Sequence, residues 1–184
     1  MAKWSRARSS SAVFDRHGVT NASQMTQADQ IAARARAAFP AEPVPPAAEL
    51  SNDHCEECAD VSKAFGARAW TDVALGDLVQ KETALLTATA WRYYLPAIIT
   101  LCVQNPEALD LLPEFTVYQL EPPKAGEEDA WFSERSGGFS KAQREVIIDY
   151  LDWYREREES EGAGWQGEPP QNVYRALKYW RSEA

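Results

Sequence analysis

The chain has 184 residues, of which 45% are apolar, 11% aromatic and 26% charged, and its formal net charge is −9. This composition is typical of a single globular domain and excludes an intrinsically disordered chain. The acidic balance argues against binding of nucleic acid or of an anionic membrane by the folded part. No run of about eighteen apolar residues is present, so no membrane span is predicted.

The cysteines and the start of the chain bear on the compartment. Three cysteines are present, an odd number that does not favour a framework of disulfides. No apolar segment of the kind found in secretory signals lies near the start. We therefore expect a cytoplasmic protein.

The N-terminal part differs from the rest in charge. Residues 1–38 hold six basic and two acidic side chains, whereas residues 39–184 hold 13 basic and 26 acidic ones. Residues 1–24 are rich in Ser and Arg and show no periodicity, which predicts a flexible basic tail. Residues 25–184 are predicted to form one helical domain, with linker-like stretches near 40–46, 122–138 and 160–170.

The first predicted helix follows Thr26, which can cap it and places Ile31 and Ala35 on one face. The proline-rich stretch PAEPVPP at 40–46 should end this helix. A second helix is predicted to begin at Asp53, which forms a capping-box pattern with Glu56, and to end at Gly66. Its thiols are expected to face the core.

The centre of the chain predicts a long helix that begins after Thr87 and contains Pro96, where we expect a kink. A short helix is predicted from Pro106 to Leu112, and a minor strand pair near 115–120, because EFTVYQLEPP has β character. The apolar arc predicted for the long helix comprises Trp91, Tyr94, Leu95, Ile98, Leu101 and Cys102.

The C-terminal part predicts two further helices. Ser140 and Gln143 form a capping box before a helix whose inward residues include Ile147 and Tyr150. Its charged end, residues 155–161, should project into solvent. The last helix, over 172–182, should turn Val173, Leu177 and Trp180 inward.

The stretch HCEEC at 54–58 is the candidate for metal or thiol chemistry. His54, Cys55, Cys58 and a distant Cys102 could supply the four ligands of a zinc site. Adjacent residues of a regular helix diverge by about 100°, so His54 and Cys55 would need an irregular helix start. The favoured interpretation makes Cys58 and Cys102 small core residues of facing helices, with no cofactor.

Redox and nucleophilic roles for the same stretch are weaker predictions. A C-x-x-C pair at a helix N-terminus favours thiolate, but the neighbouring Glu56 and Glu57 raise a thiol pKa. A Cys–His pair would have only His54 as a base, and no orienting third residue is evident. No catalytic residue is therefore predicted, although a carboxylate-based site could be hidden among the 28 acids.

Three regions are candidates for contact with a partner. Arg92 and Tyr93 either form a binding hot spot or pack internally, with Arg92 paired to a carboxylate. The acidic loop 124–138 and the charged stretch 155–161 offer further surfaces. Their candidate residues are Glu127, Glu128, Asp129, Trp131, Glu156, Glu158 and Glu159.

Three motifs point to a family. HCEEC, LTATAWRYYLPA and FSKAQREVIIDYL, in this order, resemble a bacterial family described only as a domain of unknown function. The resemblance covers roughly Met25 to the C-terminus and leaves the tail outside. It implies a small helical domain and brings no activity and no catalytic residue. Small acidic domains of this kind are often immunity proteins encoded beside toxins.

The sequence therefore predicts a mainly α-helical, compact bundle that acts as a non-enzymatic, acidic protein-binding domain. A protein that neutralises a basic bacterial toxin domain is the specific form of this hypothesis. The alternative is a small zinc- or thiol-dependent domain centred on HCEEC.

Overall fold

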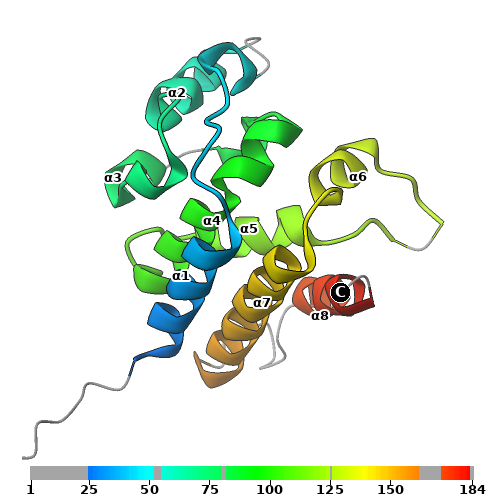
Figure 1. Ribbon diagram of the computed structural model, residues 1–184. Helices are drawn as coiled ribbons and strands as arrows, with labels where there is room; N and C mark the ends of the chain where they lie inside the picture. The colour runs from blue at the N-terminus through cyan, green and yellow to red at the C-terminus, as the bar shows by residue number, and fades with distance from the viewer. Residues whose placement is uncertain (1–24, 52–54, 80–81, 125, 162–170, 183–184) are drawn as a thin grey trace, which may run out of the picture.

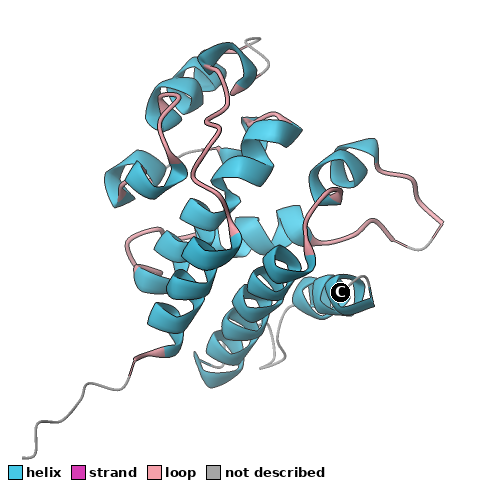
Figure 2. Ribbon diagram, in the orientation of Figure 1, coloured by secondary structure: helices cyan, strands magenta, loops and turns pink. Residues whose placement is uncertain are grey.

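The structure is a computed structural model that describes residues 25–51, 55–79, 82–124, 126–161 and 171–182. The described residues form helices joined by loops, and the backbone bridge between Ser51 and Leu86 is their only β pairing (Figures 1 and 2). The prediction of a mainly α-helical fold is confirmed. The helices are α1 (Gln27–Ala38), α2 (Glu56–Phe65), α3 (Leu75–Leu78), α4 (Ala88–Gln104), α5 (Leu112–Leu120), α6 (Ala130–Ser136), α7 (Lys141–Glu161) and α8 (Gln171–Ser182).

Helix α4 is the centre of the packing, since α1, α5, α6 and α7 all contact it. Helices α1 and α7 run side by side, α8 packs on α5 and α7, and α2 and α3 lie together at one end of the molecule (Figure 1). None of the described helices combines the length and apolar character that a membrane span requires.

Several helix ends are where the local signals place them. Thr26 caps α1 through a complete capping box with Asp29. Ser140 and Gln143 exchange the reciprocal bonds of a capping box at the start of α7. Gly66 ends α2 with a left-handed backbone, φ +61°, which a residue without Cβ adopts at little cost.

The start of α2 differs from the prediction. The N-cap of α2 is Cys55, whose Sγ accepts the backbone N–H of Cys58 at 3.1 Å. Asp53, the predicted cap, lies outside the described residues. Cys58 is buried as expected, but Cys55 is exposed, so the prediction that both thiols face the core is wrong for Cys55. A residue at an N-cap stands outside the helix and does not follow its amphipathic pattern.

Helix α4 is buried on more sides than the predicted arc. Of that arc, Leu101 is only half-buried, while Ala97, Thr100 and Val103 outside the arc are buried. A helix that is covered all round lacks a polar face to mark its orientation in sequence. Pro96 lies inside α4, as predicted.

The segment after α4 contradicts two predictions. Residues 106–111 form turns where a short helix was expected, and the expected strand region 115–120 belongs to helix α5. Pro113 lies in the first turn of α5, where its missing N–H costs nothing. Thr116, Val117 and Leu120 are buried on the inner face, and this packing outweighs the β propensity of the β-branched residues.

Two other predictions, one for a linker-like stretch and one for a helix end, differ from the structure. The stretch 122–138 contains helix α6, which Asp129 caps by accepting the N–H of Phe132 at 3.1 Å. The end of α7 does not simply project into solvent, because Arg157 is only 20% exposed and pairs with Glu107 at 2.8 Å. Of the predicted tail and of linker 160–170, residues 1–24 and 162–170 lie outside the described residues.

The cap of α4 gives a test of the fold. Thr87 Oγ1 accepts the N–H of Ala90 at 3.2 Å and donates to the carbonyl of Glu49 at 2.6 Å. Thr87→Ala should therefore lower the free energy of unfolding by about 1–2 kcal/mol. Thr89→Ala, an exposed change in the same turn, is the control and should change it by less than about 0.5 kcal/mol. Urea denaturation followed by circular dichroism measures both, and equal effects would contradict the capping role.

Candidate functional site

The structure does not gather the predicted zinc ligands that it describes. His54 lies outside the described residues, and among those described no three His, Cys, Asp or Glu side chains form a group that could hold a metal ion. The three cysteines thus do not converge, and the Cys55 thiol serves as a helix cap. A zinc site in which His54 takes part stays a prediction.

Cys102 belongs to the main core, whereas Cys58 is buried outside it. The thiol of Cys102 lies beside Thr116 and Tyr150. Burial raises the pKa of this thiol to about 12, although both neighbouring hydroxyl groups act in the opposite direction. A thiol in this state is protonated at neutral pH, which makes it a poor nucleophile or metal ligand.

Arg92 and Tyr93 both connect elements of the fold. The guanidinium of Arg92 donates to the backbone carbonyl of Glu134, so its partner is a carbonyl rather than the expected carboxylate. The Tyr93 hydroxyl donates to the carbonyl of Ala41 and accepts the N–H of Trp70. Both side chains are half-buried and line a pocket of about 210 Å³. Their role in partner binding stays a prediction.

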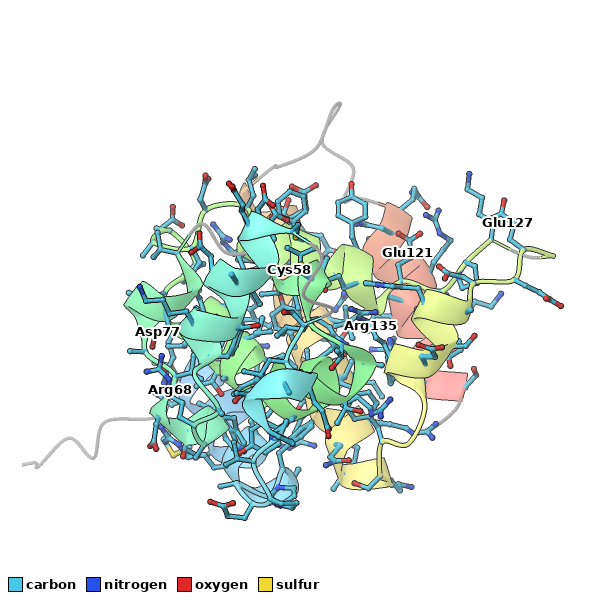
Figure 3. The ribbon with its side chains drawn as sticks, turned by 90° about the horizontal axis from the view of Figure 1, so that it is seen from above. Cys58, Arg68, Asp77, Glu121, Glu127 and Arg135 are labelled. Atoms are coloured by element: carbon cyan, nitrogen blue, oxygen red, sulfur yellow. The ribbon has the colours of Figure 1, made fainter. Side chains whose placement is uncertain are left out.

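The acidic loop is divided between structural and exposed residues. Asp129 caps α6, and Trp131 stacks on the guanidinium of Arg135, which lies 3.9 Å from the ring centroid. Glu127 and Glu128 are exposed, and Figure 3 shows Glu127 pointing outward from the loop while Arg135 lies inside the molecule. Of the four residues predicted as contacts in this loop, Glu127, Glu128 and part of the Trp131 ring are therefore exposed to solvent.

The acidic residues of 155–161 belong largely to an interhelical network. Glu156 accepts a bond from Gln27 of α1 at 3.1 Å, and Glu159 accepts one from the Tyr174 hydroxyl of α8 at 3.0 Å. Burial raises the pKa of Tyr154, and the nearby carboxylate of Glu158 raises it further by a smaller amount. Glu156 and Glu159 thus connect α7 to α1 and α8, and the role of the three carboxylates in partner binding stays a prediction.

A polar pocket of about 420 Å³ lies between α1, α7 and α8. Its charged lining is already paired, since Arg34 bonds Asp149 and Arg181 holds Asp152 with two contacts of 2.7 and 2.8 Å. Burial raises the pKa of Asp149, and the guanidinium of Arg34 opposes this. A ligand would have to break these ion pairs, so we interpret this pocket as a structural network.

The outer face of α5 is different, because it exposes large apolar side chains. Leu111, Phe115 and Tyr118 are 51%, 48% and 50% exposed. Their spacing of four and three residues puts them on one side of the helix. We call these three residues the α5 stripe.

An apolar pocket adjoins the stripe. It has a volume of about 220 Å³ and lies between α3 and the start of α5. Acidic side chains border the same face: Glu82 and Asp110 line the pocket, and Glu114 lies beside Tyr118. Partial burial, and then the Glu114 carboxylate, raise the pKa of Tyr118. Contiguous exposed apolar side chains with a polar border are typical of protein interaction sites.

The sequence contained a signal for this face that the strand prediction concealed. With a period of 3.6 residues, Leu111, Phe115 and Tyr118 share one side of a helix, and Leu112, Thr116 and Leu120 share the other. The pocket itself has no signal in sequence, because Leu78 and Leu109 are 31 residues apart and meet only through the fold.

The arrangement defines an all-α protein with an apolar, acid-bordered face. The chain matches the model of a family of unknown function (DUF6714) over residues 27–184, and it belongs to this family. The match confirms the resemblance to a family of unknown function, and it leaves the whole of the predicted tail, residues 1–24, outside. No curated protein and no solved structure matches the chain.

The Cys102 thiol predicts a pH dependence. The raised pKa means that the unfolded chain releases this proton near its ordinary pKa of 9.0, while the native protein retains it up to about pH 12. The stabilising contribution is complete below pH 9 and is lost as pH rises toward 12. Cys102→Ala should reduce the loss of unfolding free energy in this range by about 1.4 kcal/mol per pH unit.

Urea denaturation at a series of pH values above 8.5, with a reductant present, measures this slope. Cys55→Ser is the control, because the serine hydroxyl can replace the exposed Sγ of Cys55 as the capping acceptor and the Cys102 contribution stays intact. Parallel pH profiles for the wild type and Cys102→Ala would show that Cys102 does not contribute.

Proposed function

We propose that this protein is a non-enzymatic binding domain that contacts a basic partner protein through the outer face of α5. The observation that supports this most directly is the exposure of the α5 stripe beside acidic side chains that have no ion-pair partner among the residues that the structure describes. Leaving three large apolar side chains in water brings no stability to the isolated chain, whereas burying them against a partner does.

The charge of the chain supports a basic partner. Residues 39–184 carry 26 acidic and 13 basic side chains, and complementary charge speeds encounter and suppresses unsuitable partners. An immunity protein that covers a basic toxin domain is one form of this function, and the frequent occurrence of small acidic domains as immunity proteins supports it by association. A protein of this kind acts in the cytoplasm, where it meets the toxin.

If the binding site is on α5, shortening two of its exposed side chains to alanine should weaken binding. Leu111→Ala with Phe115→Ala should weaken partner binding by about tenfold to a hundredfold, because apolar anchors at interfaces contribute about 1–2 kcal/mol each. Both side chains are half exposed, so the double variant should retain its helical circular dichroism spectrum. Affinity capture from the native host, followed by titration of the captured protein, measures the change.

Two controls make the result specific. Met25→Ala removes an exposed apolar side chain before α1 and should bind like the wild type. Trp131→Ala tests the acidic loop. Loss of binding with Trp131→Ala but not with the double variant would refute the α5 assignment. Growth rescue of cells that produce a neighbouring toxin, lost in the double variant, would establish the immunity form.

A further inference from the structure

The pocket beside the α5 stripe has the construction of a receptor for one side chain. We call it the α5 cup. Its floor consists of the buried residues Leu78, Leu109 and Leu112, and the half-exposed Leu111 and Phe115 form one wall. With about 220 Å³, it has room for a single large apolar side chain.

The backbone at Asp110, which lines the α5 cup, has an unusual conformation. Asp110 has φ +50°, a left-handed conformation that is uncommon for any residue with a Cβ and is best tolerated by Asp and Asn. In this turn Leu109 and Leu112 are buried, and Asp110 and Leu111 between them are exposed. Such conformations persist where the surrounding structure enforces them, and they concentrate at binding and catalytic sites.

The charge at the rim selects the partner. Glu82 and Asp110 are exposed, and in the described part of the chain neither carboxylate has an ion-pair partner. Acids to either side are compensated, since Glu107 pairs with Arg157 and Glu121 pairs with Arg175. Two negative charges that no described cation pairs with therefore lie at the mouth of an apolar cup, where a cation beside an apolar side chain would be favoured.

We propose that the α5 cup receives one large apolar side chain from a basic segment of the partner, whose flanking Lys or Arg residues pair with Glu82 and Asp110. This inference depends on the proposed binding function and deepens it by naming the chemistry that the partner presents. A second copy of this chain is a poorer occupant, because its own α5 face brings acids against acids.

The test uses two short synthetic peptides and the full chain labelled for NMR. One peptide has a central Phe flanked by Lys residues, and its twin has Glu at the same positions. The lysine peptide should shift the methyl signals of Leu78, Leu109 and Leu112 and bind more weakly as salt is added. The glutamate peptide should not shift them.

Matched charge variants locate the contact. Glu82→Gln with Asp110→Asn should weaken binding of the lysine peptide roughly threefold to tenfold, since exposed ion pairs are individually modest. Glu127→Gln with Glu128→Gln changes the net charge equally on the distant loop and should have little effect. Equal effects of the two double variants, or equal binding of the two peptides, would overturn the proposal, as would no shift at the cup.

Two other occupants give distinct results. Binding that occurs only after removal of residues 1–24 would assign the cup to the chain's own basic segment. Concentration-dependent dimers that the lysine peptide dissociates would assign it to a second copy. Either result overturns the partner assignment. If Leu111→Ala with Phe115→Ala abolishes capture of a partner that has no basic apolar segment, the binding function stands and only the cup proposal fails.

Discussion

The burial of α4 on almost every side is the constraint on which the rest of the structure depends. Trp91, Tyr94, Leu95, Ile98 and Ile99 are all 1% exposed or less. Side chains of this size cannot be covered by one neighbour, so helices from both halves of the chain pack around α4. Buried residues of α3 and α5 belong to the same core, which fixes the position of the apolar, acid-bordered face that these two helices carry.

Arg135 shows how the layer around α4 is fixed. It is 5% exposed, and its guanidinium donates to the carbonyls of Ala84 and Leu86, which lie three residues and one residue before the N-cap Thr87. Burial lowers the pKa of Arg135 to about 10, although the carboxylates of Glu134 and Asp129 oppose this. The stacked Trp131 covers the cation from outside. A buried cation held by carbonyls specifies one docking position of α6, which an apolar contact would not.

Local signals predicted the parts of the fold that depend on a few adjacent residues. Capping at Thr26, Thr87 and Ser140, and the end of α2 at Gly66, follow from hydrogen bonds within one helical turn. Helix α5 could not be predicted in this way. Its β-branched residues favour a strand in isolation, whereas tertiary contacts, among them the hydrogen bonds of Tyr150 to Pro113 and of Trp180 to Leu120, stabilise a helix there.

The same error explains why the candidate site escaped the sequence. In a strand, side chains alternate, so Leu111 and Phe115 would face one side and Tyr118 the other. In a helix the three gather on one face, and the turn at Asp110 brings Leu109 and Leu112 beneath them. The apolar stripe, its cup and its acidic rim therefore arise together when 112–120 becomes helical. Two of the acids predicted as contacts in 155–161 also acquire partners through the fold, because packing of α7 brings Gln27 to Glu156 and Tyr174 to Glu159.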